Sequence, residues 1–201
     1  MISKITNILK PLIGTNFSSK DLEQRGIVNT IQYKCKEKIL ELTNNEILIK
    51  ESTSNKDIQI ETIETCPHIY NVDIKSHSLN KVFSTNLISV EKLRRFYTDS
   101  NNHIIYIFVD YTVENLIENS YHYDSITTIR DIKVKNIENI QWGVLQILNK
   151  GQLQIRNANK KNLFTNISRE EWLKILITEV IKFKEEFTQK WENFLIKYNK
   201  N

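Results

Sequence analysis

The sequence predicts an α/β fold, because stretches with the two-residue period of strands and stretches with the period of helices follow one another along the chain. Residues 70–76 alternate apolar and charged side chains, which is typical of a strand with one buried face. Residues 104–109 form an almost continuous apolar, β-branched run, which predicts a central strand buried on both faces. Residues 168–198 place apolar side chains at helical spacing, which predicts a long C-terminal helix.

Length and composition limit the class of protein. The chain has 201 residues, enough for one domain with a substantial core, and we expect a single domain over residues 1–201. The net charge of +4 is compatible with a polyanion partner without indicating one. Two cysteines cannot form a disulfide framework, so we expect free thiols in a reducing cytoplasm. No apolar run approaches the ~20 residues that span a bilayer, and a signal peptide's uninterrupted apolar core is missing, so we expect no membrane partner.

The first half of the chain predicts two helices followed by neighbouring strands. A short amphipathic helix is expected near residues 2–9. Ser18 and Asp21 match a capping box for a longer helix, whose buried stripe we predict as Val28, Ile31, Cys35, Ile39 and Leu42. Strands are expected at residues 46–50, 57–61 and 70–76, paired as antiparallel hairpins.

The second half predicts further strands and the last helix. Ser89 can cap a short helix, and residues 127–134 predict a strand with a slip in register at its middle. Asn149, Lys150 and Gly151 indicate a hairpin turn. Ser168 and Glu171 form a capping box at the start of the C-terminal helix, whose apolar stripe we expect to pack against the sheet.

Asp73 and Lys75 are the candidate catalytic residues. Their side chains point to the same face of the predicted strand, while Val72 and Ile74 enter the core. A carboxylate can hold a hard cation, and an ammonium can sit beside a phosphate oxygen and an attacking water. The alternative is a surface ion pair. Asp57, at one end of the neighbouring strand, could approach Asp73, or it could be a turn aspartate.

Basic and amide side chains form a second group of candidates. Lys92, Arg94 and Arg95 can contact a DNA backbone or form an ordinary solvated helix face. The amide groups of the segment around Gln141 can read adenine edges, although an Asn-rich sequence places amides in any loop. A carboxylate on the second helix, Glu23, can reach a metal site, but solvent is the usual location of glutamate.

The order of a helix, a strand with Asp57 and a strand with Asp73-x-Lys75 resembles the PD-(D/E)XK nucleases. Lys56 stands where that superfamily has a variable proline. Further segments resemble the HincII/EcoRV-like branch of the type II restriction endonucleases, over roughly residues 57–200. Four segments carry this resemblance in order: Asp73-Ile74-Lys75 with Asn86-Leu87-Ile88-Ser89, then Ile140-Gln141-Trp142, then Leu153-Gln154-Ile155, then Arg169-Glu170-Glu171-Trp172.

The resemblance implies a restriction-endonuclease-like central mixed sheet flanked by helices, in a homodimer that grips double-stranded DNA. It implies Mg²⁺-dependent hydrolysis at a short palindrome, leaving blunt ends, with a cognate DNA methyltransferase as a functional rather than physical partner. Asp57, Asp73 and the Ile74 carbonyl would hold the metal, and Lys75 would orient the attacking water.

DNA contacts are expected from Asn86, Gln141, Lys92, Asn149 and Lys150. Two alternatives stay open. One is a repair or structure-specific nuclease of the same fold. The other is a non-catalytic DNA-binding module in which Asp73 and Lys75 form only an ion pair.

Overall fold

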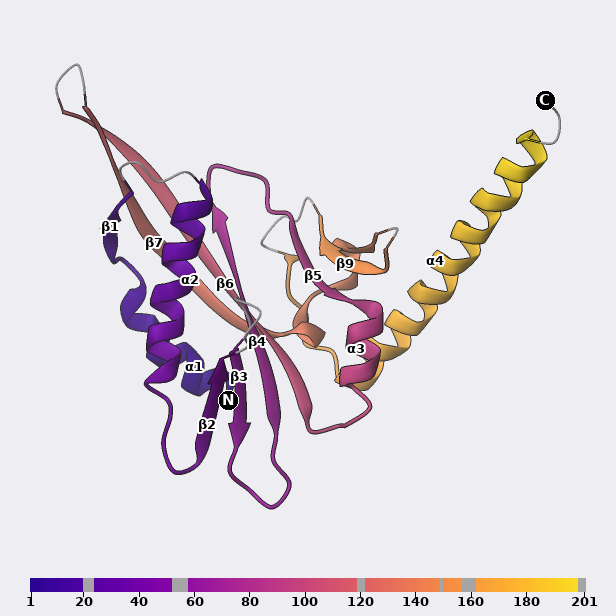
Figure 1. Ribbon diagram of the computed structural model, residues 1–201, viewed down its shortest axis with the longest axis horizontal. Helices are drawn as coiled ribbons and strands as arrows, with labels where there is room; N and C mark the ends of the chain where they lie inside the picture. Colours follow the sequence, from indigo (N-terminus) through magenta and orange to yellow (C-terminus); the bar gives the residue numbers. More distant parts are fainter. Residues whose placement is uncertain (20–23, 52–57, 119–121, 149, 157–161, 199–201) are drawn as a thin grey trace. The chain divides into compact units, whose positions relative to one another are not determined.

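The computed structural model describes residues 1–19, 24–51, 58–118, 122–148, 150–156 and 162–198 (Figure 1). The protein is mixed α/β with a long C-terminal helix, as the sequence predicts. Its chain forms two compact units, each built from two separate segments. Unit 1 contains Met1–Val82 and Asp99–Ile137, and unit 2 contains Phe83–Thr98 and Glu138–Asn201.

Unit 1 is built on a six-stranded mixed sheet in the order β1-β7-β6-β4-β3-β2. Strands β4 and β6 are parallel, and every other neighbouring pair in this sheet is antiparallel. The predicted hairpins among β2, β3 and β4 are therefore confirmed. The elements of unit 1 are α1 (Ile2–Leu9), a 3₁₀ turn (Lys10–Leu12), β1 (Asn16–Ser18), α2 (Gln24–Leu40), β2 (Ile47–Glu51), β3 (Ile58–Thr62), β4 (Ile69–Ser78), β6 (Asn102–Glu118) and β7 (His122–Asn136).

Helices α1 and α2 cover one face of this sheet (Figure 1). Val72 and Ile74 of β4 are buried there, as their alternation with charged residues predicts. Residues 104–109 of β6 are all buried, which confirms a central strand without a solvent face. The helices contribute Ile5 and Leu9 from α1 and Ile27, Ile31, Cys35 and Ile39 from α2.

The predicted slip in register within residues 127–134 is confirmed. Asp110 of β6 pairs with Asp131 of β7, but the next residue, Tyr111, pairs with Ile129. Arg130 is the extra residue of this bulge, and its side chain donates hydrogen bonds to Thr112 (2.8 Å) and Glu114 (2.8 Å). A bulge lets both strands keep their apolar residues on the core face on either side of it.

The beginning of α2 differs from the prediction. Ser18 lies in strand β1, where it pairs with Ile126 of β7, so it is not a helix cap. The described part of α2 begins at Gln24, and Asp21 and Glu23 lie outside the described residues. The buried stripe of α2 begins at Ile27 rather than at Val28, and Leu42 follows the end of the helix.

Unit 2 contains a three-stranded antiparallel sheet in the order β5-β9-β8. The expected hairpin is the β8–β9 pair, and its turn includes Gly151 with φ +71°, a conformation that side chains with a Cβ rarely adopt. Ser89 caps α3, accepting a hydrogen bond from the Lys92 amide at 3.3 Å. The elements are β5 (Thr85–Ser89), α3 (Val90–Phe96), a 3₁₀ turn (Trp142–Val144), β8 (Leu145–Ile147), β9 (Gln152–Ile155) and α4 (Arg169–Tyr198).

The first turns of helix α4 are held by the rest of unit 2. The predicted capping box is present: the Glu171 carboxylate accepts from the Ser168 amide at 2.9 Å, and the Ser168 hydroxyl accepts from the Glu171 amide at 3.2 Å. Trp172 is fully buried and donates to the Ile140 carbonyl at 3.1 Å.

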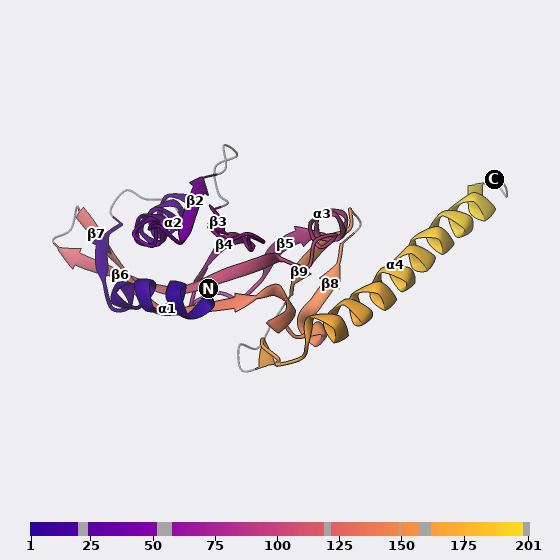
Figure 2. The same ribbon diagram turned by 90° about the horizontal axis from the view of Figure 1, so that it is seen from below.

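Beyond Leu176, the expectation that the α4 stripe packs against the sheet is wrong at Phe187, which is 43% exposed, while Val180 and Phe183 are half-buried. Figure 2 shows α4 extending past β8. Within the described residues, no helix combines the length and apolar character that crossing a bilayer requires.

Candidate functional site

Asp73 and Lys75 lie together on the face of β4 that points away from α1 and α2. Lys75 Nζ is 2.7 Å from Asp73 Oδ2, and the two side chains are 20% and 24% exposed, respectively. The ammonium also lies 5.9 Å from the ring centroid of Tyr106, the register partner of Asp73 on β6. This acid–base pair is therefore partly shielded from solvent, which strengthens its electrostatic interaction relative to a fully exposed pair.

The carbonyl of Ile74 is held by helix α2. Gln32 Nε2 donates a hydrogen bond to this oxygen at 3.0 Å. A carbonyl oxygen has two lone pairs, so it can accept a second interaction besides this hydrogen bond. Together with the Asp73 carboxylate, it offers the hard oxygen donors that Mg²⁺ takes, so the donor set fits that ion. No sequence pattern indicated Gln32, because its position on α2 becomes significant only once the helix packs on β4.

Asp57, the second proposed carboxylate, lies outside the described residues. Strand β3 begins at the next residue, Ile58, which pairs with Val72, the residue directly before Asp73. Among the described residues, no three acidic, histidine or cysteine side chains converge as a metal-binding group. The described part of the site therefore contributes Asp73, the Ile74 carbonyl and Lys75.

His77 and Asp110 continue the same face of β4 and β6, and sequence reasoning missed them as a pair. They are register partners, both are buried, and His77 Nδ1 lies 3.4 Å from Asp110 Oδ1. His77 Nε2 lies 2.7 Å from the Lys81 carbonyl, and since a carbonyl only accepts, Nε2 carries a proton. This polar pair lies two residues beyond Lys75 and extends the polar part of that face.

The spacing of Asp73 and Lys75 recurs on β7. Asp131 Oδ2 lies 3.1 Å from Lys133 Nζ, but these side chains are 43% and 41% exposed, about twice the exposure of the pair on β4. A solvent-exposed ion pair of this kind contributes little energy and is screened by salt. The more buried pair on β4 is therefore the better catalytic candidate, and the pair on β7 provides an internal control.

A row of amide side chains crosses the three-stranded sheet of unit 2. Gln154 Nε2 donates to Asn86 Oδ1 at 2.9 Å, and Gln146 Nε2 donates to Gln154 Oε1 at 2.7 Å. Arg156 Nη1 closes the row on Gln146 Oε1 at 3.0 Å. Asn86 lies in β5, Gln146 in β8 and Gln154 in β9, and Arg156 directly follows β9. Because these segments are separate along the chain, the sequence did not indicate the row, and only Asn86 was predicted to contact DNA.

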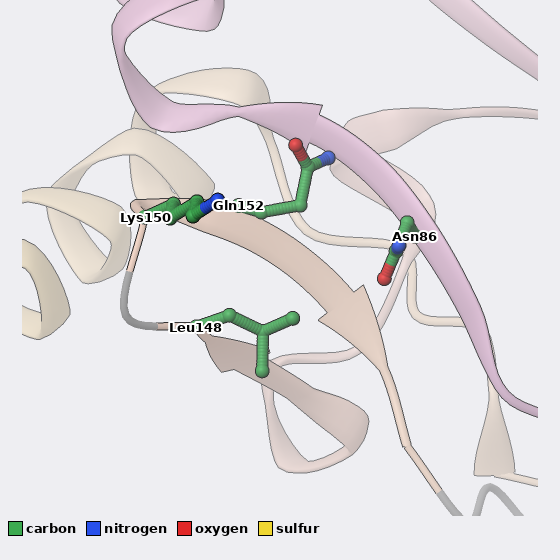
Figure 3. A pocket seen from close by; sticks show the side chains of 4 residues that line it. All are labelled: Asn86, Leu148, Lys150 and Gln152. Atoms are coloured by element: carbon green, nitrogen blue, oxygen red, sulfur yellow. The ribbon is translucent and has the colours of Figure 1, made fainter.

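Beside this row is an open pocket of about 480 Å³, lined by Asn86, Leu148, Lys150 and Gln152 (Figure 3). Gln152 Nε2 donates to the Leu87 carbonyl, which ties β9 to β5. Lys150 is exposed at the turn of the β8–β9 hairpin. The structure therefore brings together two of the predicted DNA contacts, Asn86 and Lys150.

Two other predicted DNA contacts, Gln141 and Lys92, are not among the residues that line this pocket. Gln141 is exposed at the start of the 3₁₀ turn before β8, and Lys92 is exposed in the first turn of α3. Asn149 lies outside the described residues.

The remaining basic residues of α3, Arg94 and Arg95, share one acidic partner on the same helix. Arg94 Nη2 and Arg95 Nε lie 2.9 Å and 2.8 Å from Glu91 Oε1, and hydrogen bonds from Arg94 and then Arg95 lower the pKa of Glu91 to about 2. A DNA phosphate would have to compete with Glu91 for these two guanidinium groups. No family model matches the chain, and a search of curated proteins finds no match.

Proposed function

We propose that the protein is a type II restriction endonuclease of the PD-(D/E)XK kind, which hydrolyses phosphodiester bonds at a short palindrome in double-stranded DNA. The observation that carries this proposal is the partly buried Asp73–Lys75 pair, 2.7 Å apart on one face of β4. The mixed sheet, in which β4 is parallel to β6 and antiparallel to β3, agrees with the restriction-endonuclease-like fold that forms part of the proposal. A homodimer, a cytoplasmic location and a cognate methyltransferase belong to the same proposal.

In the proposed site, Asp73 and the Ile74 carbonyl hold Mg²⁺ together with Asp57. The pairing of Ile58 with Val72 supports the choice of Asp57, since Ile58 follows Asp57 and Val72 precedes Asp73. When bound, Mg²⁺ supplies Lewis-acid polarisation of the scissile phosphate. Gln32 fixes the direction of the Ile74 carbonyl.

Lys75 has the role of orienting the attacking water, and its positive charge favours loss of the water's proton to solvent. Its ammonium is positioned by the Asp73 carboxylate and lies beside the Tyr106 ring, so it is kept on the face where a phosphate would bind. A positioned cation also stabilises negative charge that develops on a phosphate oxygen.

Recognition of the DNA is assigned to unit 2. Amide groups pair bidentately with adenine in the major groove, and lysines contact phosphates without reading sequence. Asn86, with the hydrogen-bonded row behind it, and Gln141 are proposed to read bases. Lys92, Lys150 and Asn149 are proposed to contact the backbone.

Cleavage of unmodified mixed-sequence plasmid DNA tests the proposal. With Mg²⁺ we expect discrete fragments with blunt ends, and we expect EDTA or Lys75→Ala to abolish them. Lys133→Ala is the matched control, because it truncates the lysine of the exposed Asp131–Lys133 pair, and it should cut at the wild-type rate. Absence of cleavage by folded protein, or loss of activity in Lys133→Ala alone, would contradict the assignment.

The direct ion pair of Asp73 and Lys75 also favours a second candidate, a DNA-binding module without catalysis. In that case duplex binding would depend on salt, would be unchanged by Asp73→Ala and would never lead to cleavage with any divalent metal. Cutting that follows DNA ends or junctions instead of a sequence would identify a repair or structure-specific nuclease.

A further inference from the structure

Beyond Leu176, helix α4 carries an apolar stripe that is only partly covered by the rest of unit 2. Trp172 and Leu176 are buried at the base of the helix, Val180 and Phe183 are half-buried, and Phe187 is 43% exposed. Phe183 and Phe187 stack on each other with ring centroids 6.3 Å apart. A helix with an apolar face normally obtains its stability by packing that face, so this arrangement requires a partner.

The repeat of this stripe is typical of helices that pair. Apolar residues follow one another from Leu176 at steps of four, three and four residues, twice in succession. The average step is about 3.7 residues, close to the turn of an undistorted helix, so the stripe stays on one face of two nearly straight helices. The members are Leu176, Val180, Phe183, Phe187, Trp191, Phe194 and Tyr198. The last three are assigned to the stripe by their spacing in the sequence alone.

The charges beside the stripe are complementary to those of a second copy. Glu179 directly precedes Val180, on one flank of the stripe, and Lys184 directly follows Phe183, on the other flank. In a parallel helix pair, opposite flanks meet, so each Glu179 faces Lys184 of the second copy. In an antiparallel pair, like flanks meet. Glu179 and Glu186 share a flank, so they would lie close to Glu179 and Glu186 of the second copy.

We propose that α4 forms a parallel two-helix interface with α4 of a second copy of this chain, through the stripe that begins at Leu176. The two-fold axis then runs along the helix pair, and both copies of unit 2 lie at the same end of it. The interface rests on the proposed function in that it specifies how the proposed homodimer forms. Because it depends on neither metal nor DNA, sedimentation tests it separately from cleavage.

Sedimentation equilibrium of the full chain, without DNA or metal, tests the interface. We expect a dimer at about 10 µM, and Phe187→Glu should raise the dissociation constant at least about 100-fold, because each copy would bring a charge into the apolar seam. The matched control is Gln189→Glu, which adds the same charge on the opposite, exposed face of α4 and should leave the dimer intact. Circular dichroism checks that both variants are folded.

Charge reversal tests the parallel orientation. Glu179→Lys should weaken the dimer, and the double variant Glu179→Lys/Lys184→Glu should restore it. A chain that is monomeric at about 100 µM would overturn the proposal, as would a Phe187→Glu variant that dimerises like the wild type. Tighter association of Glu179→Lys would indicate an antiparallel pair and would overturn it as well.

Discussion

At the scale of single residues, burial separates two ion pairs with the same spacing. Asp73 and Lys75 on β4 and Asp131 and Lys133 on β7 are both an acid and a base two residues apart. The alternation of strand side chains predicts that each pair shares a face. It does not predict which pair is shielded, because shielding comes from neighbouring strands such as β6, whose Tyr106 lies beside Lys75.

Burial also predicts how the two cysteines react. Cys35 is fully buried in α2, and desolvation raises the pKa of its thiol to about 12, whereas Cys66 is exposed. Because the thiolate is the reactive form, iodoacetamide should label Cys66 in the native protein at least about 100-fold faster than Cys35. Peptide mass spectrometry over a time course measures both rates.

Labelling in denaturant and a Cys66→Ser variant complete this experiment. In denaturant both thiols should react at similar rates, and native Cys66→Ser should take up almost no reagent. Equal labelling of Cys35 and Cys66 in the native protein would show that α2 does not stay packed on the sheet.

The amide row shows what sequence reasoning could not reach at this scale. Asn86 was predicted to contact DNA from its own segment, but Gln146 and Gln154 become its neighbours only through the pairing of β5 with β9 and of β9 with β8. Hydrogen bonds between strands that are far apart along the chain leave no local pattern. The segment Leu153-Gln154-Ile155 stood out in the sequence, but nothing in it indicated that Gln154 contacts Asn86.

At the scale of elements, local patterns predicted most strands and helices. Strands β4 and β6 were predicted because their periodicity is complete within a few residues. Strand β1 was not, since its three residues Asn16–Ser18 are extended only through pairing with β7. A serine side chain can cap a helix, but Ser18 lies in a strand and pairs with β7.

The N-terminus of α4 permits a test of a single element. Ser168→Ala removes the hydroxyl that accepts from the Glu171 amide, and an N-cap of this kind contributes about 1 kcal/mol to stability. We therefore expect lower thermal stability in Ser168→Ala, measured by circular dichroism, and nearly unchanged stability in Ser168→Thr, which keeps the hydroxyl.

The same capping box should respond to pH. Hydrogen bonds from the Ser168 amide and then its hydroxyl lower the pKa of Glu171. A lowered pKa means that the stabilisation is complete above the unfolded pKa and is lost as the pH falls through the folded pKa. The stability difference between wild type and Glu171→Gln should therefore shrink on acidification, and a constant difference would contradict this role of Glu171.

At the scale of the whole molecule, the sequence predicted the class α/β and the long last helix. It did not predict what the apolar stripe of that helix packs against. A helical apolar stripe shows that something covers one face, and we expected that cover to be the sheet. Among the described members of the stripe, Trp172 and Leu176 are buried, Val180 and Phe183 are half-buried, and Phe187 is exposed. Sequence periodicity is the same for an intramolecular and an intermolecular partner, so only exposure distinguishes them.

The two proposals together predict how dimerisation affects cleavage of both DNA strands. A palindrome presents two equivalent phosphodiester bonds, and a symmetric dimer can bring one site to each. Phe187→Glu, which leaves Asp73 and Lys75 unchanged, should therefore convert supercoiled plasmid to the linear form more than about tenfold more slowly than the wild type, because paired binding is lost. Gel assays at enzyme concentrations near the dimer dissociation constant measure this rate, and Gln189→Glu should match the wild type. Should Phe187→Glu linearise the plasmid as fast as the wild type while sedimenting as a monomer, strand cleavage would not require the α4 interface.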